Sequence, residues 1–215
     1  MQDAKDGTRD AHIDLSAAFT KIGGLIGNRR IRVALAGFFV FQLGWSLFYQ
    51  FILYLFRIEF GMSASETAYV LTMIGVGMVL AFCWLIGKVR PLASSKALSM
   101  LNSAALVVLT PLLPVLIHLH WLVLAGWALL MATAYGLGYS ATLVLVLSLE
   151  DESHQGLILG SAASLAALSA TVTALSGSSF AGLGALALLG LVSGCFLAAA
   201  AGRKRKAPVV SSPQA

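Results

Sequence analysis

Long stretches without any charged side chain are the feature that most constrains how this chain can fold. Lys, Arg, Asp and Glu are all absent from residues 33–56, 67–87, 97–149 and 157–202. Charged residues make up 11% of the 215 residues, whereas a soluble domain carries about 25% because it must cover a closed surface with solvated groups. The stretches therefore exclude a water-soluble fold and predict segments that lie in a lipid bilayer.

The uncharged stretches predict six transmembrane helices. A helix needs about 20 apolar residues to cross a hydrocarbon core about 30 Å thick, so the first two stretches provide one span each. The stretch 97–149 is too long for one helix and is divided by the polar and aromatic residues 118–121. The stretch 157–202 is divided by the Ser- and Gly-rich turn 176–179. The expected spans are about 33–56, 67–87, 97–117, 121–149, 157–176 and 181–202.

The composition of these spans predicts helices and excludes the strands of a membrane barrel. The runs are continuous in Leu, Ala, Val and Phe, whereas barrel strands are short and alternate apolar with polar residues. The expected fold class is therefore all-α, a polytopic membrane protein. A polar segment at 1–28 precedes the six-helix bundle at 29–203, and a tail follows at 204–215.

The basic residues predict how the bundle is oriented in the membrane. With six spans, thirteen of the fourteen Lys and Arg residues fall on one side, and Arg57 stands on the other. By the positive-inside rule the basic side is the cytoplasm. We therefore expect a multi-pass protein of the bacterial inner membrane with both termini in the cytoplasm. The basic pI of about 9.5 reflects this topology, so nucleic acid is not an expected partner.

Local signals agree with the expected boundaries. Ser63 and Glu66 have the spacing of a capping box just before the second span. The acidic residues 150–152 precede the fifth span, where a helix N-terminus favours negative charge. Pro111 and Pro114 are expected to kink the third span.

Two Gly-x-x-x-Gly pairs lie in the last two spans. Gly156 and Gly160 form the first pair, and Gly190 and Gly194 form the second. Small residues at this spacing let helices approach closely in membranes. We expect both pairs to mark packing inside the bundle; the alternative is a seam between two copies of the chain.

The candidate functional residues are neutral, because the spans contain no charge. They share a polar or aromatic side chain and helical spacing on the first and fourth spans: Gln42, Trp45, Tyr49, Gln50, Tyr135 and Tyr139. One interpretation is that they line a cavity for a small-molecule substrate. The other is that they only hold helices together, as polar residues often do in membrane bundles.

The chain resembles the second half of a major facilitator superfamily transporter. Asn28-Arg-Arg-Ile-Arg32 and Gly44-Trp-Ser-Leu-Phe48 look like the start of that half. The stretch from Gly136 to Gly160 is similar to the tenth helix, loop and eleventh helix of bacterial drug- and sugar-type members. The loop from Gly87 to Lys96 keeps the glycine and basic character of a family signature but lacks its Asp.

The resemblance implies a fold and a function. The six spans would correspond to helices seven to twelve of the family, arranged as two three-helix repeats of inverted topology. The implied function is transmembrane transport of a small molecule by alternating access, such as efflux of a drug or metabolite. The first and fourth spans would line the substrate cavity. The implied partner is a second six-helix half, either on a separate chain or supplied by a second copy of this one.

Other functions stay open or are disfavoured at this stage. Proton-coupled carriers place ionisable residues in the membrane, and the spans contain no charged residue. Either such groups lie on the partner half, or the protein is uncoupled, or it is a fragment that does not transport. The alternative function is a membrane interaction subunit or inactive fragment that does not transport. The sequence contains no enzyme motif, and Cys83 and Cys195 lack the spacing of metal ligands, so neither an enzymatic activity nor a metal or cofactor is expected.

Overall fold

The computed structural model describes residues 28–116, 118–149, 154–176 and 185–204. Most of the polar N-terminal segment, the acidic residues 150–152, the turn residues 177–179 and most of the tail lie outside the described residues. The expectations for those segments are therefore not addressed by the structure.

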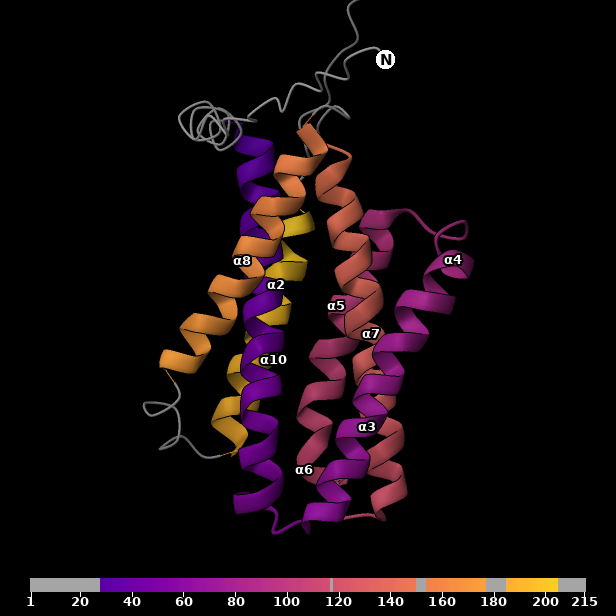
Figure 1. Ribbon diagram of the computed structural model, residues 1–215, viewed down its shortest axis with the longest axis vertical. Helices are drawn as coiled ribbons and strands as arrows, with labels where there is room; N and C mark the ends of the chain where they lie inside the picture. Colours follow the sequence, from indigo (N-terminus) through magenta and orange to yellow (C-terminus); the bar gives the residue numbers. More distant parts are fainter. Residues whose placement is uncertain (1–27, 117, 150–153, 177–184, 205–215) are drawn as a thin grey trace, which may run out of the picture.

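Every regular element in the described part of the chain is helical (Figure 1). Two long helices are uninterrupted, α7 (Trp121–Leu147) and α8 (Gln155–Leu175), and α10 (Ala185–Lys204) completes the bundle. Three others change their helical form along their length. These are α2 (Arg29–Tyr54) with the π-helical turn η1 (Leu55–Glu59), then α3 (Ala64–Leu80) with η2 (Ala81–Leu85) and α4 (Ile86–Val89), and α5 (Ser95–Leu109) with the 3-10 turn η3 (Thr110–Leu112) and α6 (Leu113–Leu116).

Five helical segments are long and apolar enough to cross a membrane: Arg29–Ile58, Ala64–Val89, Ser95–Leu116, Trp121–Leu147 and Gln155–Leu175. The sixth apolar segment, Leu186–Ala201, is shorter within the described residues. The prediction of an all-helical chain is therefore confirmed, and five to six of the six predicted spans are helices apolar enough to cross a membrane. The first span begins at Arg29, four residues earlier than the apolar run suggested.

The local signals act as expected where they are described. The Ser63 hydroxyl accepts a hydrogen bond from the Glu66 N–H at 3.3 Å, and the Glu66 carboxylate accepts one from the Ser63 N–H at 2.8 Å. This capping box satisfies two N–H groups at the start of α3. The third span is interrupted by η3, which begins at Thr110 and contains Pro111, because proline lacks the N–H that a continuous α-helix requires.

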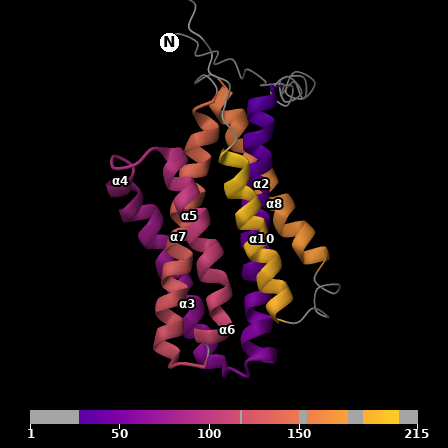
Figure 2. The same cartoon turned by 180° about the vertical axis from the view of Figure 1, so that it is seen from behind.

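The packing of the helices divides the bundle into two related groups of three. Helix α2 packs against α8 and α10, while α7 packs against α3 and α5. The groups meet where α5 contacts α10 and where α2 contacts α7. Helices α2 and α7 run in opposite directions, as Figures 1 and 2 show. Exchanging α2 with α7, α3 with α8 and α5 with α10 therefore reproduces the same set of main helix contacts.

The two outer helices are much less buried than the two central ones. In the most apolar window of α3 and of α8, 22% is buried, compared with 50% for α2 and α7. The outer helices therefore present most of their surface to whatever surrounds the bundle.

The close approach of the second and fourth spans is made possible by one glycine from each. A Cβ added to Gly77 would lie 2.6 Å from the Leu129 carbonyl oxygen, and one added to Gly136 would lie 2.6 Å from the Ala81 Cβ. Neither helix could come this close with a larger side chain at these positions. The α3–α7 seam is therefore set by Gly77 and Gly136.

The glycine pairs expected to mark packing inside the bundle do not do so. Gly156, Gly160, Gly190 and Gly194 are exposed, and a Cβ added to any of them would meet nothing within 4 Å. That expectation was wrong, because Gly-x-x-x-Gly spacing identifies a smooth helix face but not the direction in which the face points.

We predict that Gly77→Ala destabilises the bundle, whereas Gly75→Ala on the same helix does not. The added methyl at Gly77 must push α3 away from α7, and overpacking of this kind costs roughly 1–3 kcal/mol. At Gly75 nothing lies within 4 Å of an added Cβ. The free energy of unfolding, measured in mixed detergent micelles by titration with a denaturing detergent, gives the comparison. An equal decrease in the free energy of unfolding of Gly77→Ala and Gly75→Ala would contradict the role of Gly77 in the α3–α7 seam.

Candidate functional site

A buried hydrogen bond joins the two central helices. The Tyr135 hydroxyl on α7 donates to the Gln42 side-chain oxygen on α2 at 2.6 Å. Gln42 is 7% exposed and Tyr135 is 4% exposed. A polar group buried without a partner is costly, so each of these side chains compensates for the burial of the other.

The Tyr135 ring is also stacked on aromatic rings of α2. Its centroid lies 3.8 Å from that of Trp45, with the planes 9° apart, and 5.5 Å from that of Phe41, with the planes 5° apart. Phe41 and Trp45 are four residues apart and therefore lie on the same face of α2. The same face of α2 thus supplies both the ring contacts and the hydrogen-bond acceptor for Tyr135.

Tyr139 extends this contact by one helical turn along α7. Its ring lies 6.1 Å from that of Tyr135, 5.6 Å from Phe38 on α2 and 6.0 Å from Phe82 in η2. We refer to Gln42, Trp45, Tyr135 and Tyr139 as the α2–α7 cluster. The cluster therefore connects the first, second and fourth spans.

Tyr49 lies at the exposed edge of the cluster. Its ring is 6.4 Å from that of Trp45, and 52% of the residue is exposed. It is the member of the predicted set through which a molecule outside the bundle would first meet the aromatic rings.

Gln50 points to a different neighbour. Its side-chain oxygen accepts a hydrogen bond from the Thr173 hydroxyl on α8 at 3.0 Å. One turn earlier, the hydroxyls of Ser46 and Ser169 lie 3.1 Å apart and make a second α2–α8 link. Gln50 therefore belongs to the α2–α8 contact and not to the α2–α7 cluster.

The structure thus brings four of the six predicted residues together, places Tyr49 beside them and separates Gln50 from them. Sequence reasoning missed Phe41, which stacks on Tyr135, and the hydroxyl partners Ser169 and Thr173. The two hydroxyls were detectable as an i, i+4 pair on a span otherwise rich in Ala and Leu. Phe41 was not, because one phenylalanine in an apolar helix does not indicate which ring it will meet.

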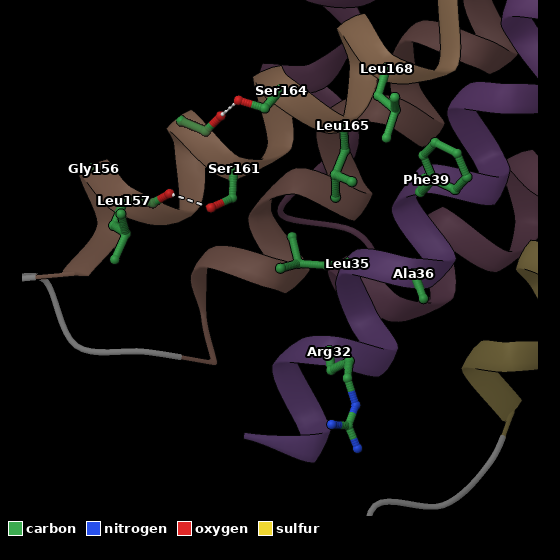
Figure 3. A pocket seen from close by; sticks show the side chains of 11 residues that line it. Arg32, Leu35, Ala36, Phe39, Gly156, Leu157, Ser161, Ser164, Leu165 and Leu168 are labelled. Carbon is green, nitrogen blue, oxygen red and sulfur yellow. Dashed lines mark hydrogen bonds between the residues drawn. The ribbon is translucent and has the colours of Figure 1, made fainter. Parts of the chain in front are cut away.

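A groove with a volume of about 620 Å³ lies between α2 and α8 (Figure 3). Its α2 wall is formed by Arg32, Leu35, Ala36 and Phe39, and its α8 wall by one face from Gly156 to Leu168. None of the six predicted residues lines this groove.

The α2–α7 cluster offers neutral hydrogen-bonding groups and aromatic faces. Such a site suits recognition by stacking and hydrogen bonding. Within the described residues, no three His, Cys, Asp or Glu side chains gather to hold a metal ion. The histidine before α7 has a structural role, because the His120 Nδ1 accepts the Leu122 N–H at 3.3 Å and caps that helix.

Comparison of the chain with protein-family models, with curated proteins and with solved structures found no match.

We predict that Gln42→Leu and Tyr135→Phe each destabilise the bundle, and that the double variant loses less than the sum. Each single change removes one partner of a buried hydrogen bond, while the double change removes both. Interhelical hydrogen bonds in membranes couple by about 0.6 kcal/mol and at most about 1.7 kcal/mol, so the coupling is expected in this range. A double-mutant cycle of unfolding free energies in detergent measures it. If the two single losses of unfolding free energy add up to the loss in the double variant, the hydrogen bond contributes nothing to stability.

Proposed function

We propose that this chain is a six-helix half of a major facilitator superfamily-type transporter, which moves a small molecule by alternating access. The observation that carries the proposal is that the main helix contacts are the same when the first three spans are exchanged with the last three. Exchanging α2, α3 and α5 for α7, α8 and α10 reproduces the main helix contacts, and the exchanged helices α2 and α7 run in opposite directions. Inverted repeats of this kind underlie many secondary transporters, whose substrate sites lie where the repeats meet.

The position of the α2–α7 cluster supports the same proposal. Gln42 and Trp45 lie on α2, the first of the six spans, and Tyr135 and Tyr139 lie on α7, the fourth span. The polar and aromatic side chains are therefore concentrated where the two groups meet. In the proposed carrier, a substrate would contact Tyr49, Trp45 and the neighbouring tyrosines, with a second six-helix half providing the opposite wall.

A non-transporting membrane subunit is the second candidate, and it too has an observation in its favour. Gln42 and Tyr135 are hydrogen-bonded to each other and buried. This is the arrangement expected if the cluster only holds α2 against α7. Transport measurements distinguish the two functions.

The proposed orientation places the basic end of the bundle in the cytoplasm. That end holds the starts of α2, α5 and α8 and the end of α10, and η1 with Arg57 lies at the other (Figure 1). In a variant with Cys83→Ala and Cys195→Ala, a cysteine introduced at Ser94 should resist a membrane-impermeant thiol reagent added to intact cells. A cysteine introduced at Ser63 should react. The opposite pattern of labelling would reverse the orientation.

We predict that Gln42→Leu and Tyr139→Leu each reduce transport at least about tenfold, which corresponds to 1.4 kcal/mol of lost interaction. The chain would be expressed alone and together with a candidate six-helix partner, and export of a panel of lipophilic drugs and dyes would be measured. Thr72→Ala on the exposed side of α3 is the matched control, because Thr72 hydrogen-bonds only its own helix, at the Ala68 carbonyl. Melting temperatures in detergent separate lost function from lost folding.

Two outcomes would count against this assignment. Unchanged transport in the folded Gln42 and Tyr139 variants would remove the cluster from the substrate path. Absence of transport by the chain, both alone and with its candidate partners, would favour the non-transporting subunit.

A further inference from the structure

The α2–α8 groove is apolar along its length and basic at one end. Leu35, Ala36 and Phe39 form most of its α2 wall, and Arg32 stands at the end where α2 and α8 both begin (Figure 3). Among the described residues, no Asp or Glu lines it. A molecule that filled the groove would therefore be apolar for most of its length and negatively charged at one end.

The groove owes its width to glycines on α8. Gly156 and Gly160 line it, and an added Cβ at either position would meet nothing within 4 Å. These two glycines, which pack against no helix of this chain, thus leave a smooth apolar wall. A larger side chain at either position would narrow the groove.

The serines in the α8 wall offer no hydrogen atom to a polar ligand. The Ser161 hydroxyl donates to the Leu157 carbonyl and the Ser164 hydroxyl to the Gly160 carbonyl, both at 2.9 Å, as the dashed lines in Figure 3 show. Each hydroxyl is turned back onto its own helix. A ligand in this part of the groove is therefore recognised by its apolar surface.

The basic end of the groove is strengthened by its surroundings. Arg29 lies three residues before Arg32 and so shares its side of α2. The α8 helix begins at the same end, and a helix N-terminus carries a partial positive charge. An anion near Arg32 would interact favourably with both.

We propose that the α2–α8 groove binds an anionic phospholipid from the leaflet that borders the basic end of the bundle. One acyl chain lies along Leu35, Phe39 and the glycine wall of α8, and the phosphate lies beside Arg32 and Arg29. Basic pockets between transmembrane helices bind anionic headgroups in this way. An apolar transmembrane helix would cover the apolar wall but would bring no anion to Arg32 and Arg29, whereas an anionic lipid brings one, so charge complementarity favours the lipid. The inference requires only that the bundle lies in a membrane and does not depend on transport.

The test uses the full chain purified in detergent and native mass spectrometry with phosphatidylglycerol and phosphatidylcholine of identical acyl chains. A basic residue near a membrane surface contributes about 1 kcal/mol to binding anionic lipid, which is about five-fold in affinity. Arg32→Gln should therefore weaken binding of the first phosphatidylglycerol about five-fold and weaken binding of phosphatidylcholine less, because the choline group neutralises the phosphate of that lipid. Arg90→Gln, an exposed arginine at the same end but outside the groove, is the matched control.

A second pair of variants tests the apolar wall. Gly160→Leu should weaken binding of both lipids because it fills the groove. Gly190→Leu, at an equally open position on α10, should not change binding. Melting temperatures confirm that all four variants are folded.

Three results would overturn the proposal. The first is an unchanged preference for phosphatidylglycerol in Arg32→Gln, and the second is an equal loss in Arg32→Gln and Arg90→Gln, which would indicate diffuse surface charge. The third is a dimer that Gly160→Leu dissociates while lipid binding stays the same. That result would assign the groove to a second copy of the chain.

Discussion

Inside a bilayer every backbone N–H and C=O must find its partner within the protein, and this requirement accounts for the long, nearly continuous helices of this chain. The same environment weakens the usual force that brings helices together, because lipid tails are as apolar as leucine. Association then depends on close packing and on hydrogen bonds between helices. The described seams use both, with glycines between α3 and α7 and paired side-chain oxygens and hydroxyls between α2 and its two neighbours α7 and α8.

The α3–α7 contact and the α2–α8 contact are related by the exchange of helices, but they differ in how tightly the helices pack. Gly77 lies against α7 and Gly136 lies against the second span, and their lack of a side chain allows the two spans to approach closely. In the related α2–α8 pair, the glycines Gly156 and Gly160 line an open groove instead, and the helices are linked by Ser46, Gln50 and their partners on α8. Although the same set of helix contacts recurs, α3 packs tightly against α7, whereas α8 leaves a groove between itself and α2. The aromatic and polar side chains of the α2–α7 cluster lie between them.

The candidate site was predictable in part, and for a clear reason. Gln42 and Trp45 fall on one face of the first span, and Tyr135 and Tyr139 fall on one face of the fourth, so helical spacing alone grouped each pair. Spacing could not show that α7 faces Gln42, or that α8 takes Gln50 through Thr173. Which neighbour a polar face meets depends on how each helix is rotated about its axis, and that rotation is decided by the packing of all six.

The sequence by itself determined that the chain is all-helical and that five to six of its segments are apolar enough to cross a membrane. These properties follow from the free energy of placing each residue in lipid or water, which is local and nearly additive along the chain. The tertiary structure decided which glycines close a seam and which remain exposed, which aromatic rings stack, and where a groove forms beside Arg32. These properties depend on the relative rotation and approach of helices far apart in sequence, so two glycines in apolar helices, such as Gly77 and Gly160, have opposite surroundings.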